Sequence, residues 1–502
     1  MVKQITARYR DRLSGILSCY DRIVITGTIP GACYAAGMTT FFHMHQIRIF
    51  DYARFAEPLR ERIRSKAQLL ADESGVTMEH VSKSHIRKED LVAAVLKVRG
   101  DHPGLVHIIS AMEACDSYEP WHNKTNHKTY LKSKPGKCLH YYFYFQDEEL
   151  GLIYLRVPTW CPFRLQFYCN GHNWLARMLS SHGVGYKMAD NAFIDIDDWN
   201  LAQELADSFS PDHLHRILDR YAAMCCPVLD VFDVSYHWSI MQIEYSTDLV
   251  FRSRQFMQPL YEELSRQAIL SVKAEQVATF LGKKITPQLA QEIGSRFATR
   301  IEGTCIKHRL GKASVKMYDK FGLVLRLETT TNDVSFFKHH RKVEHRDGSS
   351  ERCFATVKKS IYSIIDLREV LLGCNKRYLE YLSSLDDFSA GHRNLKKLIG
   401  PQDADGQKLK GINFFDKTEQ ALMRSLQRPE FNLKGMRRAD LKPFLSNLSP
   451  AGISRQLWRF RKLGIIKKMA GTYRYYLTRL GRSVIAACCR ITELTIVTAL
   501  AC

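Results

Sequence analysis

The chain has 502 residues, of which 45% are hydrophobic and 25% charged, so it is long enough for two to four globular domains with substantial cores. Its formal net charge of +21 favours a polyanionic partner, most often nucleic acid. The sequence lacks a run of about 18 apolar residues, and its start is unlike a signal peptide. We therefore expect no membrane partner, and a cytoplasmic location in which the fourteen scattered cysteines stay reduced.

The first part of the chain predicts an α/β domain over residues 1–225. Apolar spacing predicts a helix over residues 1–20, and β-branched residues predict a strand over 21–28. Further helices and strands alternate after it, and the aromatic stretch 138–157 predicts a hairpin. The predicted helices cover 53–75, 87–99 and 198–224, and the predicted strands cover 105–111, 138–146 and 151–157.

The middle of the chain, residues 226–390, predicts a helical segment followed by a basic, antiparallel β-rich block. Residues 236–285 are predicted to be mostly helical, and a long amphipathic helix is predicted at 361–385. Consecutive strands are predicted at 300–307, 314–320, 323–329, 336–345 and 352–358. Residues 391–412 are polar and contain several glycines, which is typical of a linker.

The last part, residues 413–502, predicts three helices, a hairpin and a closing helix. The helices are predicted at 415–428, 438–444 and 451–463, with Ser449 as the N-cap and Pro450 at the first position of the third helix. The hairpin covers 465–478, with Gly471 at its turn, and the closing helix follows it. The predicted fold class is therefore α+β and multidomain.

This segment resembles the winged helix-turn-helix of MarR-type regulators, most closely at Tyr-Tyr-Leu-Thr-Arg-Leu-Gly over residues 475–481. The resemblance implies a third helix in the major groove and a basic wing beside a phosphate strand. It assigns groove contacts to Arg455, Gln456 and Arg459, and wing contacts to Lys467, Lys468 and Arg474. The alternative is a winged helix that contacts protein, for example in a homodimer.

The strongest catalytic candidates lie on the predicted strands 314–320 and 323–329. Strand alternation places Lys316, Tyr318 and Lys320 on one face, and places Arg326 and Glu328 together on the neighbouring strand. A tyrosine could attack phosphorus, a carboxylate could hold Mg²⁺ or Mn²⁺, and the cations could stabilise developing charge. The candidate catalytic set is Tyr318, Asp319, Lys320, Arg326 and Glu328.

The pattern Tyr-Asp-Lys followed by Arg-x-Glu resembles a strand pair in some phage and plasmid replication initiators, although their His-hydrophobic-His metal motif is missing here. The alternative is a basic sheet surface that only grips phosphates. Lys338, Arg341 and Lys342 would extend that surface.

Two further sets of residues have metal-ligand chemistry. On the helix predicted at 236–285, His237, Glu244 and Asp248 would share one face and could bind a metal. The alternative is a capped helix whose histidine lies in the core with its hydrogen bonds satisfied. The second set, near strand ends, contains carboxylates that could form a two-metal nuclease site: Asp21, Glu113, Asp116, Glu119 and Asp147, with His122.

The aromatic strand 140–145 favours a core hairpin, with a single-stranded RNA platform as the alternative. Neither a phosphate loop nor a dinucleotide fingerprint is found, so no nucleotide cofactor is expected.

Over residues 99–107, 156–160 and 316–328 the chain resembles a family of large bacterial proteins often found near mobile elements. Together these features predict a basic nucleic-acid-binding protein, associated with a mobile element or with replication, with a metal-dependent strand-cleaving activity. The alternatives are a non-catalytic protein that binds a structured RNA, and a DNA-binding transcriptional regulator.

Overall fold

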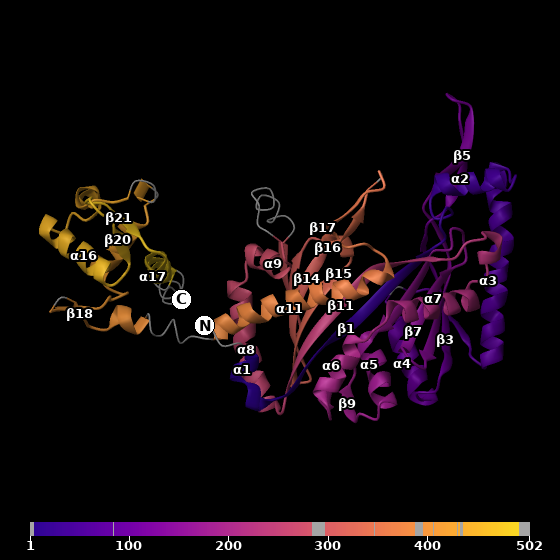
Figure 1. The fold of residues 1–502 in the computed structure, drawn as a ribbon, viewed down its shortest axis with the longest axis horizontal. Helices are drawn as coiled ribbons and strands as arrows, with labels where there is room; N and C mark the ends of the chain where they lie inside the picture. Colours follow the sequence, from indigo (N-terminus) through magenta and orange to yellow (C-terminus); the bar gives the residue numbers. More distant parts are fainter. Residues whose placement is uncertain are drawn as a thin grey trace. The chain divides into compact units, whose positions relative to one another are not determined.

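The computed structural model describes residues 5–83, 85–283, 297–345, 347–386, 395–404, 406–428, 430–431 and 435–490. The chain divides into two compact units, residues 1–386 and 387–502, which are shown in Figure 1. Both units combine helices with β-strands, so the predicted α+β multidomain class is confirmed. Among the described residues, no helix is long and apolar enough to span a bilayer.

The larger unit is built on one eleven-stranded sheet in the order β12-β13-β14-β15-β11-β1-β8-β7-β6-β3-β2. At its centre β1 (Leu13–Thr28) pairs with β11 (His237–Phe251) and with β8 (Leu165–Asn170), antiparallel in both cases. The remaining strands are β2 (Met78–His80), β3 (Gly104–Cys115), β6 (Gly136–Asp147), β7 (Gly151–Pro158), β12 (Phe297–Glu302), β13 (Cys305–Leu310), β14 (Ala313–Lys320) and β15 (Val324–Thr331). Of the pairs in this sheet, β2 with β3 is parallel.

The predicted boundary at residues 225 and 226 is wrong, because this sheet crosses it. Strand β1 comes from the predicted first domain and β11 from the predicted second, yet they pair from Leu13↔Phe251 to Thr28↔His237. The helix predicted over residues 1–20 is also wrong. Within its described part, α1 (Ile5–Arg8) and a 3₁₀ turn (Arg10–Arg12) are helical, and Leu13 begins β1. Pairing of this segment with β11 outweighs its helical apolar spacing.

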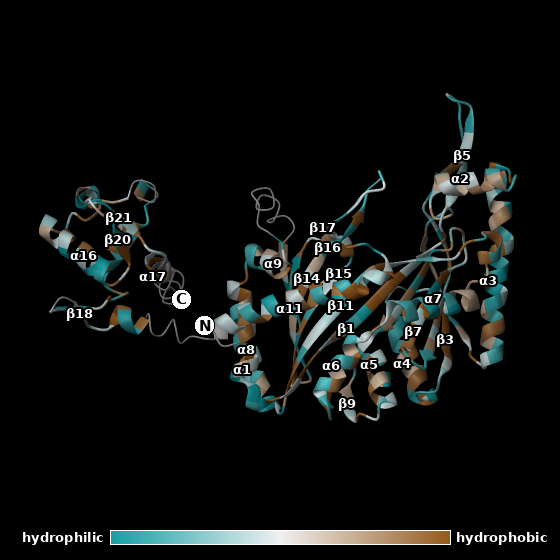
Figure 2. Cartoon of the chain, in the orientation of Figure 1, coloured by the Kyte–Doolittle hydropathy of each residue, from teal (hydrophilic) through white to brown (hydrophobic). Residues whose placement is uncertain are grey.

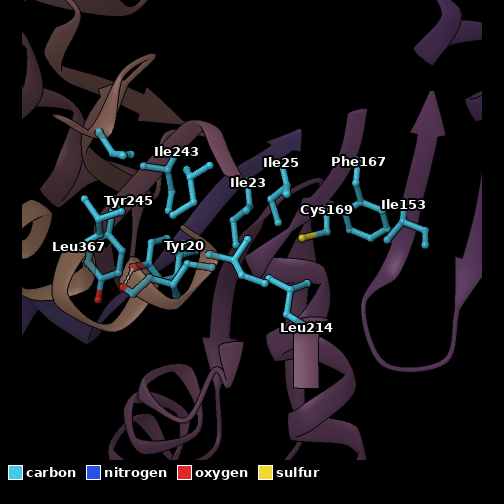
Figure 3. Close-up of a cluster of buried hydrophobic side chains, with 14 of the residues drawn as sticks. Tyr20, Ile23, Ile25, Ile153, Phe167, Cys169, Leu214, Ile243, Tyr245 and Leu367 are labelled. Carbon is cyan, nitrogen blue, oxygen red and sulfur yellow. Dashed lines mark hydrogen bonds between the residues drawn. The ribbon is translucent and has the colours of Figure 1, made fainter. Parts of the chain in front are cut away.

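Helices cover the sheet and bury its apolar side chains. Figure 3 shows Tyr20, Ile23 and Ile25 of β1 packed toward Leu214 of α7 (Pro211–Cys225) and Leu367 of α11 (Ile364–Asp386). The predicted helices at 53–75, 87–99 and 361–385 are confirmed as α3 (Tyr52–Ser74), α4 (Lys88–Arg99) and α11. The other α-helices in the described part of this unit are α2 (Ala35–Met44), α5 (Gly171–Ser181), α6 (Trp199–Asp207), α8 (Arg254–Ser271) and α9 (Ala274–Phe280).

Two hairpins extend away from the main sheet (Figure 1). One consists of β4 (Tyr118–Asn123) and β5 (Lys128–Ser133), and the other of β16 (Lys338–Glu344) and β17 (Ser350–Thr356). Their tips are hydrophilic, as Figure 2 shows. A third, short hairpin joins β9 (Tyr186–Ala189) to β10 (Ala192–Ile196).

The smaller unit contains the predicted helices and hairpin in the predicted order. They are α13 (Lys417–Leu426), α15 (Arg438–Leu441), α16 (Pro450–Lys462), β20 (Ile466–Lys468), β21 (Tyr475–Leu477) and α17 (Arg479–Arg490). Ser449 caps α16, accepting a hydrogen bond from the Gly452 N–H at 3.1 Å, and Pro450 begins the helix as predicted. Ile453, Leu457 and Phe460 of α16 are buried in the core of this unit.

The predicted linker at 391–412 is largely part of this smaller unit. Leu398 and Ile412 are buried in the core of the unit, and a short hairpin, β18 (Gln402–Ala404) and β19 (Gln407–Leu409), lies between them. The polar composition of the segment reflects exposed positions beside these apolar ones. Residues 391–394 lie outside the described residues.

Candidate metal centre

Three carboxylates meet on one face of the central sheet. Asp21 projects from β1, Glu244 from β11 and Glu328 from β15, and one ligand oxygen of each lies within 4.8 Å of the others. Asp21 and Glu328 are buried, and Glu244 is partly exposed. The three strands lie side by side in the order β15-β11-β1, so the sheet itself places the carboxylates together.

An irregularity in β1 aims Asp21 at this cluster. In the pairing of β1 with β11, Tyr20 is opposite Tyr245 and Ile23 is opposite Ile243. Asp21 and its successor Arg22 therefore share the position opposite Glu244, which is the arrangement of a β-bulge. Tyr20 and Ile23 pack into the core on the other face, so the bulge lets an acidic side chain leave an otherwise apolar strand.

Lys316 of β14 bridges two of the carboxylates. Its Nζ lies 3.4 Å from Glu244 Oε1 and donates a hydrogen bond to Glu328 Oε1. Tyr318, two residues further along β14, donates its hydroxyl hydrogen bond to the other oxygen of Glu328. The register Lys316↔Glu328 and Tyr318↔Arg326 confirms the predicted sharing of one face by these side chains.

Arg326 lies deep beside Asp21. Its Nε and Nη2 donate to both oxygens of Asp248 at 2.7 and 2.6 Å, and Nη1 donates to Asp21 Oδ2 at 3.3 Å. His172, at the start of α5, places Nδ1 3.3 Å from Asp21 Oδ1. Asn170 and Asn191 donate hydrogen bonds to that oxygen, at 2.9 and 2.8 Å. Asp21 is therefore held in one orientation by cationic and amide groups.

The pKa values of the three carboxyls differ because their neighbours differ. Burial would raise the pKa of Asp21, but the hydrogen bond and charge of His172, together with Arg326, hold it well below its usual range. Burial likewise opposes ionisation of Glu328, and the ammonium of Lys316 lowers the pKa of that carboxyl. Burial and the negative charge of Glu328 raise the pKa of Glu244 to about 7.

The residues of this cluster fit a hard divalent cation. Oxygen donors from carboxylates are the ligands that Mg²⁺ and Mn²⁺ prefer. Ligand oxygens on Mg²⁺ lie about 4.2 Å apart when opposite and about 2.9 Å apart when adjacent, so binding of the ion would draw the three carboxylates closer together. Arg326 and His172 lie beside Asp21, whereas Glu244 and Glu328 share the ammonium of Lys316. Burial, together with the negative charge of Glu328, raises the pKa of Glu244, and a bound cation would favour its ionised form.

The predicted catalytic residues separate into two groups. Tyr318, Arg326 and Glu328 belong to the cluster, and Lys320 lies near its edge, where it donates to Asn191 Oδ1. Asp319 does not belong to it. Because side chains alternate along β14, Asp319 faces the other side of the sheet, where it accepts a hydrogen bond from the Gly322 N–H at 2.7 Å.

The predicted metal set of His237, Glu244 and Asp248 is divided as well. The prediction depends on a helix over 236–285, but the first part of this segment is strand β11. His237 is exposed at the end of β11, opposite Thr28, and is far along the strand from the cluster. Glu244 is a member of the carboxylate cluster, whereas Asp248 is bound to Arg326.

The predicted two-metal set is dispersed over the larger unit. Glu113 accepts hydrogen bonds from Lys88 and Tyr142, and Asp147 accepts from the Glu149 and Leu150 N–H groups in its turn. Asp116 is paired with Arg164, Glu119 with Lys134, and His122 with Thr129. Asp21 alone of that set joins the centre. A charged residue inside the apolar strand 20–26 is the sequence signal that identifies it.

The aromatic strand β6 belongs to the core, which confirms that prediction. Tyr141, Phe143 and Phe145 are buried in the main core, and Tyr142 and Tyr144 are buried in a smaller apolar cluster on the other face.

On α16, the residues predicted to contact a groove differ in exposure. Arg455 is exposed. Arg459 is buried, donates from Nη2 to Glu419 Oε1 at 2.7 Å, and donates from Nη1 to Gln456 at 2.9 Å. Because Arg459 is engaged in the core of the smaller unit, the prediction that it contacts a groove is wrong.

The remaining predicted phosphate-binding residues lie on the hairpins of the two units. Lys467 and Lys468 of β20 are exposed, and Arg474 is half-buried. Lys338 and Lys342 share the exposed face of β16, whereas Arg341 points to the other face and donates to the Thr356 carbonyl oxygen at 2.8 Å.

Comparison of the chain with protein-family models, with curated proteins and with solved structures finds no match. The function of the chain is therefore inferred from the geometry of these residues.

Proposed function

We propose that this chain processes nucleic acid, in association with a mobile element or with replication, and that its larger unit cleaves or joins phosphodiesters with the help of a divalent metal. The observation that carries the proposal is the meeting of Asp21, Glu244 and Glu328 on three adjacent strands beside Lys316. The net charge of +21 supports a polyanionic substrate for this acidic centre.

Asp21, Glu244 and Glu328 would hold the ion, and Mg²⁺ or Mn²⁺ bound there would polarise a phosphoryl group and favour ionisation of a nucleophile. The protein's own groups have distinct roles. Lys316 lies at the partly exposed side of the cluster, where its ammonium can stabilise negative charge that develops on phosphate oxygens. Arg326 orients Asp21, and the hydroxyl of Tyr318 orients Glu328.

We propose a duplex-binding role for the smaller unit. Three helices, a two-stranded hairpin and a closing helix in this order are typical of a winged helix-turn-helix. Arg455 on α16 and Lys467 and Lys468 on β20 are exposed cations on the two elements that such a domain applies to a groove and a phosphate strand. The ligand is DNA or RNA, and contact with a second copy of the chain is the competing role for this unit.

A non-catalytic nucleic-acid-binding protein, either an RNA-associated protein or a transcriptional regulator, is the second candidate. This candidate is favoured by Lys316, because its ammonium contacts Glu244 and Glu328 and partly neutralises their charge without a metal ion. In that case the cluster would be a buried ion network that stabilises the sheet.

The test is cleavage of end-labelled DNA and RNA, single- and double-stranded, by the full chain with Mg²⁺ or Mn²⁺. Asp21→Asn and Glu328→Gln should each lower the rate by at least about 100-fold, since each removes a ligand charge. Asp319→Asn is the matched control, because Asp319 lies on the opposite face of β14, and it should retain the wild-type rate. Circular dichroism and Mn²⁺ titration of each variant separate loss of the ion from loss of the fold.

Two results together would refute the proposed metal-dependent cleavage. The chain would bind nucleic acid without metal and without cleaving it, and wild-type and Glu328→Gln protein would bind Mn²⁺ with equal affinity. These results would favour the non-catalytic candidate.

A further inference from the structure

A pocket of about 600 Å³ opens at the base of the hairpin formed by β16 and β17. It lies between the C-terminal end of α9, the middle of α11 and the start of the hairpin. The residues that carry its chemistry are Lys283, Phe337, Lys338, Phe354, Glu369 and Arg377.

The pocket is separate from the carboxylate cluster. Helix α11 covers the face of the sheet that carries Tyr20 and Tyr245, and the hydroxyl of Tyr20 donates to the Ile364 carbonyl oxygen of its first turn. The cluster residue Glu244 precedes Tyr245 in β11, so it projects from the opposite face. Substitutions in the pocket therefore leave the cluster untouched.

Positive charge is concentrated in this pocket. Burial and the positive charge of Lys338 lower the pKa of Lys283. Arg377 is held in the wall, donating from Nε to the Phe280 carbonyl oxygen at 2.9 Å. Glu369 is the single acidic residue among the described lining residues, against three cations. An anion between Lys283 and Lys338 would relieve their repulsion, and a phosphate has the matching charge and oxygen acceptors.

The pocket also presents an aromatic surface. Phe354 of β17 is 57% exposed, on the same face of the hairpin as Lys338, and its ring centroid lies 5.3 Å from that of His340. Phe337 is buried at the base. An exposed phenyl ring beside cations is the combination with which proteins stack unpaired bases and follow the phosphate backbone.

We propose that this pocket binds a nucleotide unit of a single-stranded segment, with the base against Phe354 and a phosphate between Lys283 and Lys338. The inference rests on the proposed function in that it takes the ligand to be nucleic acid, and it adds a single-strand binding site away from the carboxylate cluster. The hairpin then acts as a clamp on an unpaired stretch of the substrate.

The test is fluorescence anisotropy of labelled single-stranded and blunt duplex oligonucleotides with the full chain, in EDTA so that no cleavage occurs. The variant Lys338→Ala/Phe354→Ala should weaken single-strand binding by about tenfold or more, with a smaller effect on duplex. The matched control is Lys376→Ala/Ile365→Ala, which removes one exposed cation and one exposed apolar side chain from α11 outside the pocket. Glu369→Gln should tighten single-strand binding, because it removes the acidic group.

Equal single-strand affinity in wild-type and pocket variant would overturn the proposal. Calorimetric titration with AMP distinguishes two ligands of the pocket, a free nucleotide and a nucleotide unit within a single strand. If AMP binding is lost in the pocket variant while oligonucleotide affinity is unchanged, the pocket takes a free nucleotide and the single-strand site is refuted. Glu328→Gln should lose cleavage but keep the wild-type single-strand affinity in EDTA, whereas the pocket variant should lose that affinity and bind Mn²⁺ as the wild type does. Failure of one proposal is thereby distinguished from failure of the other.

Discussion

Arg326 binds Asp248 through two parallel hydrogen bonds, Nε to Oδ1 at 2.7 Å and Nη2 to Oδ2 at 2.6 Å, with both side chains fully buried. The two residues face each other directly in the pairing of β11 with β15. A planar guanidinium matches a carboxylate in this geometry, and a lysine would not. Arg326 also reaches Asp21, so the pair connects the sheet interior to the carboxylate cluster.

Replacement of Arg326 by methionine should strongly destabilise the larger unit. It leaves Asp248 and Asp21 buried beside an apolar side chain, and breaking such a pair costs about 3–5 kcal/mol. Urea unfolding followed by circular dichroism measures the change. Arg22→Met is the control, because Arg22 is exposed and contacts the Tyr168 ring at 5.3 Å, and it should cost less than about 1 kcal/mol. Equal stability of both variants would contradict the structural role of Arg326.

Metal affinity should increase with pH between 6 and 8, because a proton and the ion compete for Glu244. The pKa of Glu244 is raised to about 7, so the carboxylate is mostly protonated at pH 6 and mostly ionised at pH 8. The apparent Mn²⁺ affinity should therefore fall by about tenfold on going from pH 8 to pH 6. Calorimetric titration across this range measures it. Glu244→Gln should bind Mn²⁺ more weakly and with little pH dependence, and an unchanged slope would exclude Glu244 as the competing group.

Tyr318→Phe should lower the cleavage rate by about tenfold without abolishing it, as expected for a group that orients a ligand. Burial and the charge of Glu328 raise the pKa of Tyr318, so its hydroxyl stays protonated and donates to Glu328. Gel analysis of stopped reactions tests the nucleophile hypothesis directly. A covalent adduct between protein and DNA that disappears in Tyr318→Phe would show that the tyrosine attacks phosphorus and would overturn the orienting role.

Alanine substitution of Arg455 and of Arg459, four residues apart on α16, should affect different properties: duplex binding for the first and stability for the second. Arg455→Ala should weaken duplex binding without changing stability, because this side chain is exposed. Arg459→Ala should destabilise the smaller unit by about 3 kcal/mol, since it leaves Glu419 without its buried partner. Anisotropy and thermal unfolding of the full chain measure the two effects. Loss of duplex affinity in a stable Arg459→Ala protein would show that this side chain contacts nucleic acid after all.

The exposed lysines of β20 should contribute to duplex affinity by contacting phosphates of the nucleic acid. Lys467→Ala/Lys468→Ala should reduce the slope of log affinity against log salt by about two, because each lysine that neutralises a phosphate contributes close to one to that slope. Binding to specific and unrelated duplexes should weaken to a similar extent. An unchanged salt slope would place these lysines away from the backbone of the nucleic acid.

Local structure was predictable from the sequence where residues close together in the chain determine it. The cap formed by Ser449 and Pro450, the apolar spacing of α3 and α11, and the alternation that pairs Lys316 with Glu328 all depend on residues close in sequence. The strand β1 was not predictable in the same way. Its first half has helical apolar spacing and becomes extended because β11, more than two hundred residues later, pairs with it.

The sequence by itself determined a basic α+β chain, the helices and hairpin of the smaller unit, and the shared face of Tyr318 and Lys316. Tertiary structure decided which carboxylates meet. Asp21, Glu244 and Glu328 come from distant parts of the chain, and β-sheet pairing has no local sequence signal for the partner strand. The bulge at Asp21 and the buried guanidinium of Arg326 then orient the cluster, and both depend on packing that forms only when the whole sheet is assembled.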